Sequence, residues 1–269
     1  TGNRFQFNFR NHRKIVVADG RHGWAGGFNV GDEYLGRDPR IGAWRDTHLK
    51  LEGPAVSALQ LAFIEDWHWA TGEILDLEWR TAPAQRNGVP ALVLPSGPAD
   101  RFETASLMVQ HALASARRRI WIASPYFVPD EGMQAALKLA ALRGVDVRVL
   151  IPQQPDNPLL FFAAYAFLQP LLDAGVRVFR YHDGFLHCKT ILVDDEAAAV
   201  GTVNLDNRSL RLNFEVTVWV ADRDFAARMA AKYVHDFAGA HEMSPQDVQD
   251  RPWWFLVASR AAYLLAPIL

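Results

Sequence analysis

The chain has 269 residues, 50% of them hydrophobic, and is therefore long enough to bury a sizeable core as one large or two medium domains. Its formal net charge is −2, so it lacks the basic excess with which nucleic-acid-binding proteins neutralise phosphates. Cys188 is the only cysteine, which excludes an intrachain disulfide and a cysteine-rich zinc site. No uninterrupted apolar run is long enough to span a bilayer.

The first predicted element follows a histidine and a lysine. The stretch "HRKIVVAD" at 12–19 predicts a strand over 14–18, which leads through a turn and a second apolar run to Gly26 and Asn29. Lys14 lies two residues after His12 and so faces the same side of the strand. An imidazole and an ammonium on one side of an otherwise apolar strand suggest chemistry rather than packing.

The middle of the chain alternates strand-like and helix-like segments. We expect strands at 91–96, 145–152 and 176–181, a β-rich run at 119–128, and helices at about 103–116, 131–142 and 158–173. Alternation at these lengths predicts an α/β fold, with a sheet covered by helices on both faces.

The opening stretch recurs as "HCKTILVD" at 187–194, an offset of 175 residues. The matched pairs are His12 and His187, Lys14 and Lys189, Asp19 and Asp194, Gly26 and Gly201, and Asn29 and Asn204. Five identities in one ungapped register predict two copies of one ββ unit in two similar halves.

The repeat also predicts the domain organisation. We expect the end of a first half at 1–82, a second half at 83–245 and an apolar tail at 246–269, with the Pro/Gly-rich stretch 81–90 as the boundary between halves. Only 11 residues precede His12, whereas several predicted β-α units precede His187. We therefore expect the first half to be incomplete and the chain to be a fragment that lacks its N-terminal part.

Two histidines allow a division of labour that one imidazole cannot perform within a single step. One neutral ring would attack phosphorus to give a phospho-histidine, while the other, protonated, would donate to the leaving alkoxide. Each ring also needs a partner on its second nitrogen to fix its tautomer. We expect Asp46 to orient His12 and Glu215 to orient His187, because each carboxylate sits in a strand-like segment that could lie beside its own histidine strand.

The remaining motif residues predict a phosphate site. The ammonium groups of Lys14 and Lys189 would hold the non-bridging oxygens, and the amides of Asn29 and Asn204 would add donors without charge. Gly26, Gly27 and Gly201 would let backbone approach closely. Because lysines and amides take over the usual role of a metal, we expect no metal and no cofactor.

A single copy of this motif is weak evidence, since His-x-Lys at a strand start is more often surface decoration. Two in-register copies reverse that judgement. Asp19 and Asp194 lie at odd spacing from the histidines, on the opposite pleat face, which favours a turn-capping role over proton transfer.

The double H-x-K-x4-D motif resembles that of the phospholipase D superfamily, and within it the chain is most similar to the bacterial cardiolipin synthases. The segments that carry the resemblance are "RNHRKIVVADG", "GGFNVGDEYLG", "WRDTHLKLEGPAV", "SPYFVPD", "GFLHCKTILVDD" and "VGTVNLDNRSLRLNFEV". The resemblance implies a duplicated α/β fold, with two mixed β-sheets flanked by helices and the active site at a pseudo-twofold interface. It also implies the catalytic set His12, Lys14, Asp19, His187, Lys189 and Asp194, with His12 the nucleophile and His187 the acid.

The reaction implied by the resemblance is transfer of a phosphatidyl group from one phosphatidylglycerol to another, giving cardiolipin and glycerol. Phosphatidylglycerol and membrane lipid are then the partners, and no nucleic acid is expected. The implied location is the bacterial cell membrane, with the catalytic part facing the cytoplasm and anchoring helices that this sequence lacks.

Two apolar segments favour a lipid substrate. The segment 158–172 is either a buried core helix or a wall for acyl chains, and the tail 253–269 is either a helix docked on the body or an interfacial helix. The alternatives to a transferase are a phospholipase D or another phosphodiester hydrolase, less readily a nuclease, and a binding module with a dead site. Low basic charge disfavours the nuclease, and two intact motifs disfavour the binding module.

Overall fold

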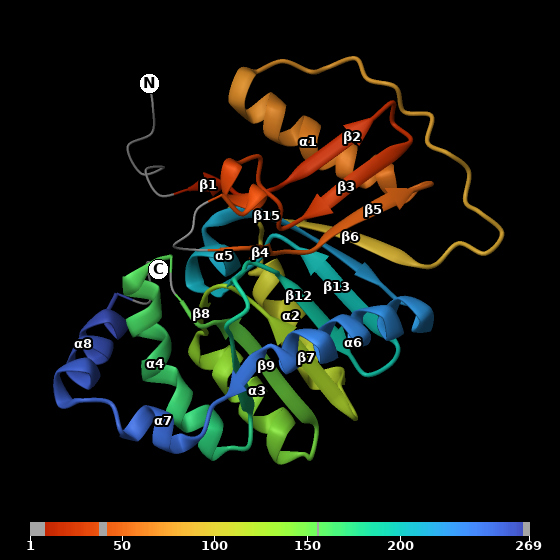
Figure 1. Ribbon diagram of the computed structural model, residues 1–269. Helices are drawn as coiled ribbons and strands as arrows, with labels where there is room; N and C mark the ends of the chain where they lie inside the picture. The colour runs from red at the N-terminus through yellow and green to blue at the C-terminus, as the bar shows by residue number, and fades with distance from the viewer. Residues whose placement is uncertain (1–8, 38–41, 155, 266–269) are drawn as a thin grey trace.

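A computed structural model describes residues 9–37, 42–154 and 156–265 (Figure 1). Its strands are β1 (Arg10–Asn11), β2 (Ile15–Ala18), β3 (His22–Gly26), β4 (Trp44–Arg45), β5 (His48–Glu52), β6 (Ala91–Ser96), β7 (Arg119–Ala123), β8 (Phe127–Val128), β9 (Asp146–Pro152), β10 (Arg177–Tyr181), β11 (Phe185–Leu186), β12 (Thr190–Val193), β13 (Ala197–Gly201), β14 (Leu205–Asp206), β15 (Asn213–Val220) and β16 (Ala240–Glu242). Its helices are the 3₁₀ helix η2 (Asp32–Leu35) and the α-helices α1 (Ala55–Thr71), α2 (Thr104–Ser115), α3 (Glu131–Leu142), α4 (Pro158–Asp173), α5 (Asn207–Arg211), α6 (Arg223–Ala238), α7 (Pro245–Gln249) and α8 (Trp253–Tyr263).

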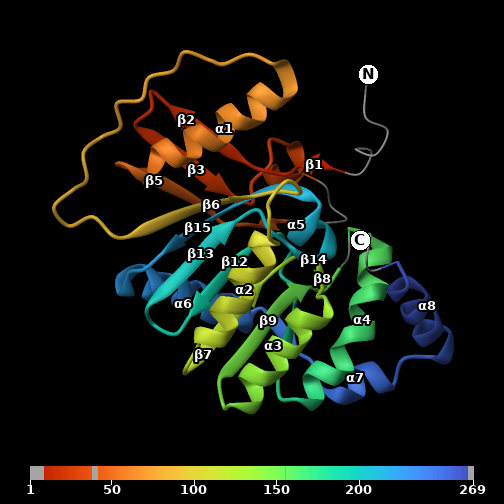
Figure 2. The ribbon, with the colours of Figure 1, turned by 180° about the vertical axis from the view of Figure 1, so that it is seen from behind.

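The larger sheet is mixed and follows the order β1-β15-β13-β12-β7-β9-β10-β16, with β6 also paired to β15. Strands β7, β9 and β10 are parallel, whereas β12, β13 and β15 are antiparallel. Helices α2, α3 and α4 bury their apolar residues against one face and α6 covers the other, as Figures 1 and 2 show from opposite sides. The predicted α/β fold with helices on both faces is confirmed.

The smaller sheet contains the first motif. Its strands follow the order β2-β3-β5, all antiparallel, which is the order of β12-β13-β15 in the larger sheet. The predicted repeat of a ββ unit is therefore present, extended in each copy by a third strand. Val56 and Leu59 of α1 are fully buried in a cluster that also contains Val216 and Val218 of β15, so this unit packs on the larger sheet.

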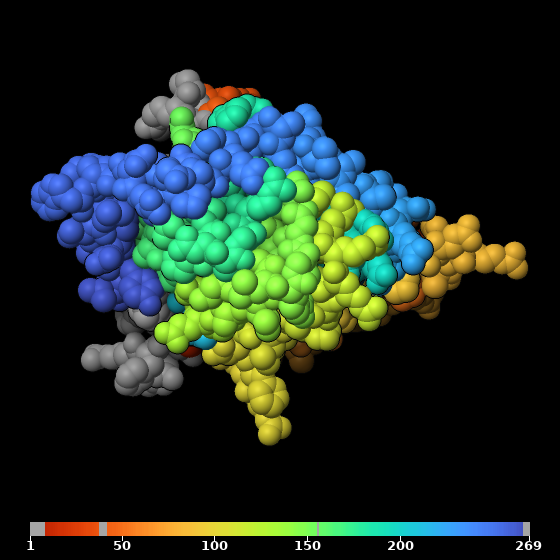
Figure 3. All heavy atoms as spheres, turned by 90° about the horizontal axis from the view of Figure 1, so that it is seen from below, coloured from red at the N-terminus to blue at the C-terminus, as the bar shows by residue number. Residues whose placement is uncertain are grey.

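The two segments that the sequence left open are both docked helices. Helix α4 buries six residues, among them Tyr165 and Leu168, and is a core helix. Helix α8 packs on α4 through Phe255, Ser259 and Ala262, and it lies at the edge of the molecule (dark blue in Figure 3).

The exposed residues of α8 are mostly apolar, with Trp253 and Trp254 77% and 53% exposed, and include one charged residue, Arg260. Among the described residues, no helix combines the length and the apolarity that crossing a membrane requires.

Candidate active site

Short parallel strand pairs between the two motif copies place the histidines. Strand β1 pairs with β15 in parallel, with Asn11 opposite Phe214, and the N–H of His12 donates to the carbonyl of Phe214 at 2.9 Å. The register then brings His12 beside Glu215, whose Oε2 lies 2.9 Å from the ring Nδ1.

The second histidine is placed by the same geometry. Strand β4 pairs with β11 in parallel, with Arg45 opposite Leu186, and the N–H of His187 donates to the carbonyl of Arg45 at 2.8 Å. Asp46 therefore lies beside His187, with its Oδ2 2.7 Å from the ring Nδ1. The two imidazole–carboxylate pairs are equivalent in register as well as in contact.

The predicted assignment of each carboxylate to its own motif's histidine is wrong, because the pairs are crossed. Within each copy the carboxylate segment is separated from the histidine segment by the middle strand, β3 in the first copy and β13 in the second. Each carboxylate instead reaches the histidine of the other copy. Asp46 and Glu215, the two carboxylates expected to orient the histidines, are thus exchanged between His12 and His187, and their orienting role stays a prediction.

The two lysines occupy equivalent positions. Lys14 Nζ donates to the carbonyl of His12 at 2.8 Å, and Lys189 Nζ donates to the carbonyl of His187 at 2.7 Å. Burial lowers the pKa of Lys14 to about 8 and that of Lys189 to about 7, against the opposing attraction of Glu215 and Asp46. Each ammonium interacts with both carboxylates, and the two ammoniums repel each other, so the two motif copies converge on one centre.

The two histidines differ in environment. The side chain of His12 is 27% exposed, whereas that of His187 is 7% exposed. Burial lowers the pKa of His187, as does the charge of Lys189, while the hydrogen bond to Asp46 works in the opposite direction. The motif repeat is symmetric in sequence, but its two imidazoles are not equivalent in the folded chain.

The glycines make room for strands and for a carboxylate. A Cβ on Gly26 would lie 2.5 Å from the carbonyl oxygen of Thr47, and one on Gly201 would lie 2.6 Å from that of Val216. A Cβ on Gly27 would lie 2.0 Å from Oδ1 of Asp46. The backbone at these glycines therefore makes a close approach, as predicted. The groups that it approaches are the neighbouring strand and the side chain of Asp46.

The two predicted phosphate-binding amides are unequal. Asn204 is 3% exposed, and its Oδ1 has no hydrogen-bond partner among the described residues. Asn29 is exposed. A role for either amide in holding phosphate stays a prediction.

The motif aspartates shape turns. Asp19 and Asp194 have positive φ values of 55° and 51°. The carboxylate of Asp194 accepts the backbone N–H groups of the three arginines 117–119. Burial would raise the pKa of Asp194, but these bonds outweigh burial and lower it. Asp194 thus has the capping role that its pleat position predicts, and this bonding argues against counting it as catalytic with the rest of its motif.

Three residues at the site were missed by the sequence analysis. Tyr34 Oη lies 3.0 Å from His187 Nδ1 and 3.2 Å from Asp46 Oδ2. The ring of Trp44 lies 5.1 Å from that of His187, and Asn213 Nδ2 donates to Glu215 Oε1 at 3.0 Å. None of them belongs to the repeat, although Trp44 and Asn213 each lie two residues before a carboxylate that was singled out.

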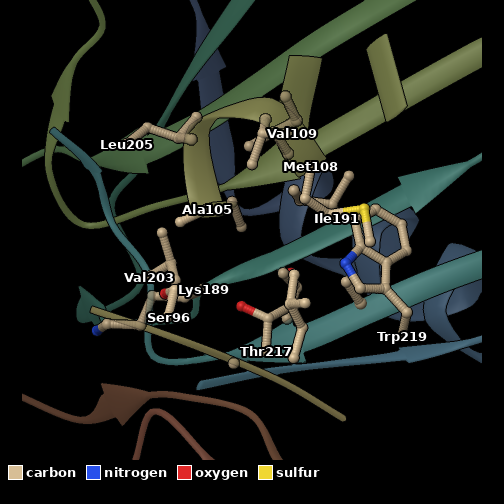
Figure 4. A pocket seen from close by; sticks show the side chains of 16 residues that line it. Ser96, Ala105, Met108, Val109, Lys189, Ile191, Val203, Leu205, Thr217 and Trp219 are labelled. Atoms are coloured by element: carbon tan, nitrogen blue, oxygen red, sulfur yellow. The ribbon is translucent and has the colours of Figure 1, made fainter. Parts of the chain in front are cut away.

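A small apolar cavity lies behind Lys189, between α2 and the larger sheet (Figure 4). Its lining includes Met108, Val109 and Trp219. Its volume of about 30 Å³ is far below that of a ligand pocket, so it is not the substrate site. Among the described residues, no group of three or more His, Cys, Asp or Glu side chains is arranged to hold a metal ion.

Known proteins are similar to this chain in sequence. Residues 109–237 match the family described as "Cardiolipin synthase, PLD-like domain". The chain is 52% identical over 267 residues to cardiolipin synthase A of Pseudomonas putida, covering 99% of this chain and 55% of that protein. It is 51% identical over 269 residues to cardiolipin synthase A of Pseudomonas aeruginosa (strain LESB58), covering 99% of this chain and 54% of that protein. The chain therefore spans about half the length of these curated relatives.

The fold is also that of a solved structure. The crystal structure of phosphatidylserine synthase from Haemophilus influenzae Rd KW20 matches with a TM-score of 0.74 at 16% identity, covering 99% of this chain and 72% of that one. By its sequence, the chain belongs to the phospholipase D superfamily, since residues 109–237 match a PLD-like domain and relatives that are 52% identical cover 99% of the chain. Within that superfamily, the relatives to which its sequence is similar are cardiolipin synthases A.

Proposed function

We propose that this chain carries the catalytic centre of a cardiolipin synthase, which transfers a phosphatidyl group from one phosphatidylglycerol to another and releases glycerol. The observation that carries the proposal is the crossed pairing of His12 with Glu215 and of His187 with Asp46. That pairing gives one centre two imidazoles, each with an orienting carboxylate and a neighbouring ammonium. The names of the sequence relatives support the substrate class.

The first step forms a covalent intermediate. Nε2 of His12, held by Glu215 through Nδ1, attacks phosphorus, and the bond from phosphorus to the glycerol oxygen breaks. Protonated His187 gives its proton to that oxygen, so glycerol leaves as a neutral alcohol. Lys14 and Lys189 hold the non-bridging oxygens, on which negative charge accumulates in the transition state.

The second step reverses the proton movement. The hydroxyl of a second phosphatidylglycerol attacks phosphorus, the phosphorus–nitrogen bond breaks, and neutral His187 accepts the hydroxyl proton. Burial disfavours the imidazolium form of His187, but the phosphate anion of a bound substrate favours it. Substrate binding therefore favours the protonated His187 that acts as the acid in the first step. Once His187 has given its proton to the leaving alcohol, it is neutral and can act as the base in the second step.

Hydrolysis is the alternative function. The same centre would act as a phospholipase D if water, rather than an alcohol, attacked the phospho-histidine. Exclusion of water from the intermediate would separate the two outcomes.

We further propose that the enzyme works at the bacterial cell membrane with this part facing the cytoplasm. The outer side of α8 combines two exposed tryptophans, Trp253 and Trp254, with the aliphatic Val257 and Leu264. Aromatic and aliphatic side chains on one helix side are typical of helices that lie at headgroup depth. We propose likewise that the chain consists of the end of a first half at 1–82, a second half at 83–245 and an apolar tail at 246–269.

Product analysis tests the function. The intact protein is incubated with vesicles that contain phosphatidylglycerol labelled in its phosphate and terminal glycerol. Labelled cardiolipin together with free glycerol supports transfer, whereas phosphatidic acid as the main product supports the hydrolase. His12→Ala and His187→Ala should each lose nearly all turnover, and near-normal turnover in either variant would remove the two-histidine mechanism.

A further inference from the structure

Tyr34 lies at the junction of the second histidine and the first motif's loop. Its hydroxyl is 3.0 Å from His187 Nδ1, 3.2 Å from Asp46 Oδ2 and 3.1 Å from the carbonyl oxygen of Gly27. Since Nδ1 lies 2.7 Å from Asp46 Oδ2, the ring N–H points at the carboxylate, and the phenol can give its proton to Asp46 or to Gly27. One hydroxyl thus reaches the imidazole, its carboxylate and the backbone of the Gly27–Asn29 loop.

The ring of Tyr34 is fixed independently of its hydroxyl. Its centroid lies 4.8 Å from that of Trp44 and 5.3 Å from that of Phe28, and Trp44 in turn contacts the His187 ring at 5.1 Å. Burial raises the pKa of Tyr34 above its ordinary value, so the hydroxyl keeps its proton throughout the working range of pH. The phenol is therefore a permanent donor in a fixed position.

In the described part of the chain, the carboxylate beside the first histidine is held differently. At His12 the carboxylate is held by the amide of Asn213, which donates to Glu215 Oε1 at 3.0 Å. One repeat length after Tyr34 the chain has Ser209, whose N–H donates to Asp206. The phenol is an addition to one half of a duplicated site, and it distinguishes the two imidazoles.

We propose that Tyr34 is a positioning residue, which orients His187 through Asp46 and ties that pair to the loop that bears Asn29. The inference rests on the proposed function, because it concerns the histidine that exchanges a proton with the departing and arriving alcohols. By donating to Asp46, the phenol weakens the pull of that carboxylate on the imidazolium and so makes His187 the readier proton donor. The groups that face His187 and set its titration are Asp46, Tyr34, Lys189 and Lys14.

The test is Tyr34→Phe, which keeps the ring packing and removes only the hydroxyl. The intact protein is labelled with ¹⁵N-histidine in detergent micelles, and the His187 resonance is identified by its loss in His187→Gln. We expect the pKa of His187 to rise by about 0.5 to 1 unit, which corresponds to one hydrogen bond removed from Asp46. We also expect kcat to fall about tenfold with KM within about twofold, and the limb of the pH–rate profile that reports His187 to move to higher pH.

Tyr233→Phe is the matched control. It removes another buried hydroxyl, that of Tyr233 on helix α6, which donates to the carbonyl of Thr190 over 2.9 Å. This variant should leave both the His187 titration and kcat unchanged. An unchanged or lowered pKa of His187 in Tyr34→Phe would overturn the proposal. The titration needs no substrate, so a protein that makes no cardiolipin but shows the shifted titration would refute the proposed function and leave the positioning role standing.

Discussion

Nδ1 of His12 lies 2.9 Å from Oε2 of Glu215, a carboxylate 203 residues further along the chain. The equivalent contact, His187 to Asp46, runs back over 141 residues. Each histidine is therefore oriented by a side chain from the other copy of the motif. The pairing is testable separately from the reaction.

The crossed pairs predict which side chains are energetically coupled. In a double-mutant cycle on the free energy of unfolding, His12→Ala and Glu215→Gln should couple by roughly 0.5 to 3 kcal/mol, whereas His12→Ala and Asp46→Asn should be additive. Glu215→Gln and Asp46→Asn should each lower kcat roughly 10²- to 10⁴-fold, because an amide does not fix the catalytic tautomer. Chemical denaturation and the cardiolipin assay measure the two effects. Coupling between His12 and Asp46 instead would contradict the register.

The buried ammonium of Lys189 predicts a conflict between stability and activity. Burial lowers the pKa of Lys189 from its ordinary value of 10.5 to about 7, so between these pH values the unfolded chain binds more protons than the folded one. The contribution of Lys189 to stability therefore improves as the pH rises from about 7 to 10.5. Lys189→Met should be more stable than the wild type by about 1 to 4 kcal/mol at pH 6, with a smaller advantage at pH 9.

Urea unfolding at both pH values measures this difference, and turnover of Lys189→Met should fall at least about 100-fold. Lys14→Met is the comparison. The pKa of Lys14 is lowered only to about 8. The stability advantage of Lys14→Met should therefore be smaller than that of Lys189→Met, and it should shrink only as the pH rises above about 8. A Lys189→Met variant that is less stable than the wild type at pH 6 would contradict the burial argument.

Asp194 should matter for stability rather than for chemistry. Asp194→Ala leaves three backbone N–H groups without their acceptor and should cost roughly 2 to 4 kcal/mol in thermal unfolding. Because the folded pKa of Asp194 is lowered, its contribution is present above the ordinary value of 3.8 and is lost as the pH falls below it. Asp195→Ala removes only half-exposed ion pairs to Arg118 and Arg119 and should cost less than about 1 kcal/mol. Equal costs for the two variants would count against the capping role.

Phosphate binding by ammonium groups predicts insensitivity to chelators. With EDTA in the assay, turnover of the intact protein should stay within about twofold of the untreated value, because Lys14 and Lys189 would supply the charge that a metal ion supplies elsewhere. A metal-dependent phospholipase assayed in parallel shows that the chelator is effective. Loss of activity that added divalent cations restore would exclude the lysine-based site.

Membrane contact through α8 predicts where lipid meets the protein. In vesicles of brominated phosphatidylglycerol, the tryptophan fluorescence of the intact protein should be partly quenched, and Trp253→Phe with Trp254→Phe should remove most of the quenched fraction. Trp69→Phe is the control, since Trp69 is 63% exposed on α1. Quenching that persists in the α8 variant but disappears in Trp69→Phe would place the membrane against α1 instead.

Capping residues in the sequence predicted the bounds of two helices correctly. The expected ranges 131–142 and 158–173 match α3 and α4 because the chain marks both starts: Asp130 and Asn157 accept N–H groups of the first turns. The β-rich run 119–128 contains two strands, β7 and β8. Pro125 lies in the interruption, and proline has no N–H to continue a strand ladder.

The carboxylate pairing could not be predicted in the same way. Strands β1, β4 and β11 are two residues long, too short for any periodicity, and their partners are chosen by the docking of the two copies. The repeat identified His12, His187 and both lysines because it compares the copies with each other. It could not find Tyr34, which exists in one copy only, or reveal which copy supplies which carboxylate.

The exchange of carboxylates has a consequence for biosynthesis. A ribosome releases residue 12 long before residue 215, so the first imidazole waits without its acceptor until the last long strand of the second copy has docked. Neither copy holds a complete histidine–carboxylate pair, because each supplies the carboxylate that contacts the other copy's histidine. Completion of the fold is therefore what would assemble both pairs, and a chain that ends before residue 215 would lack the partner of His12.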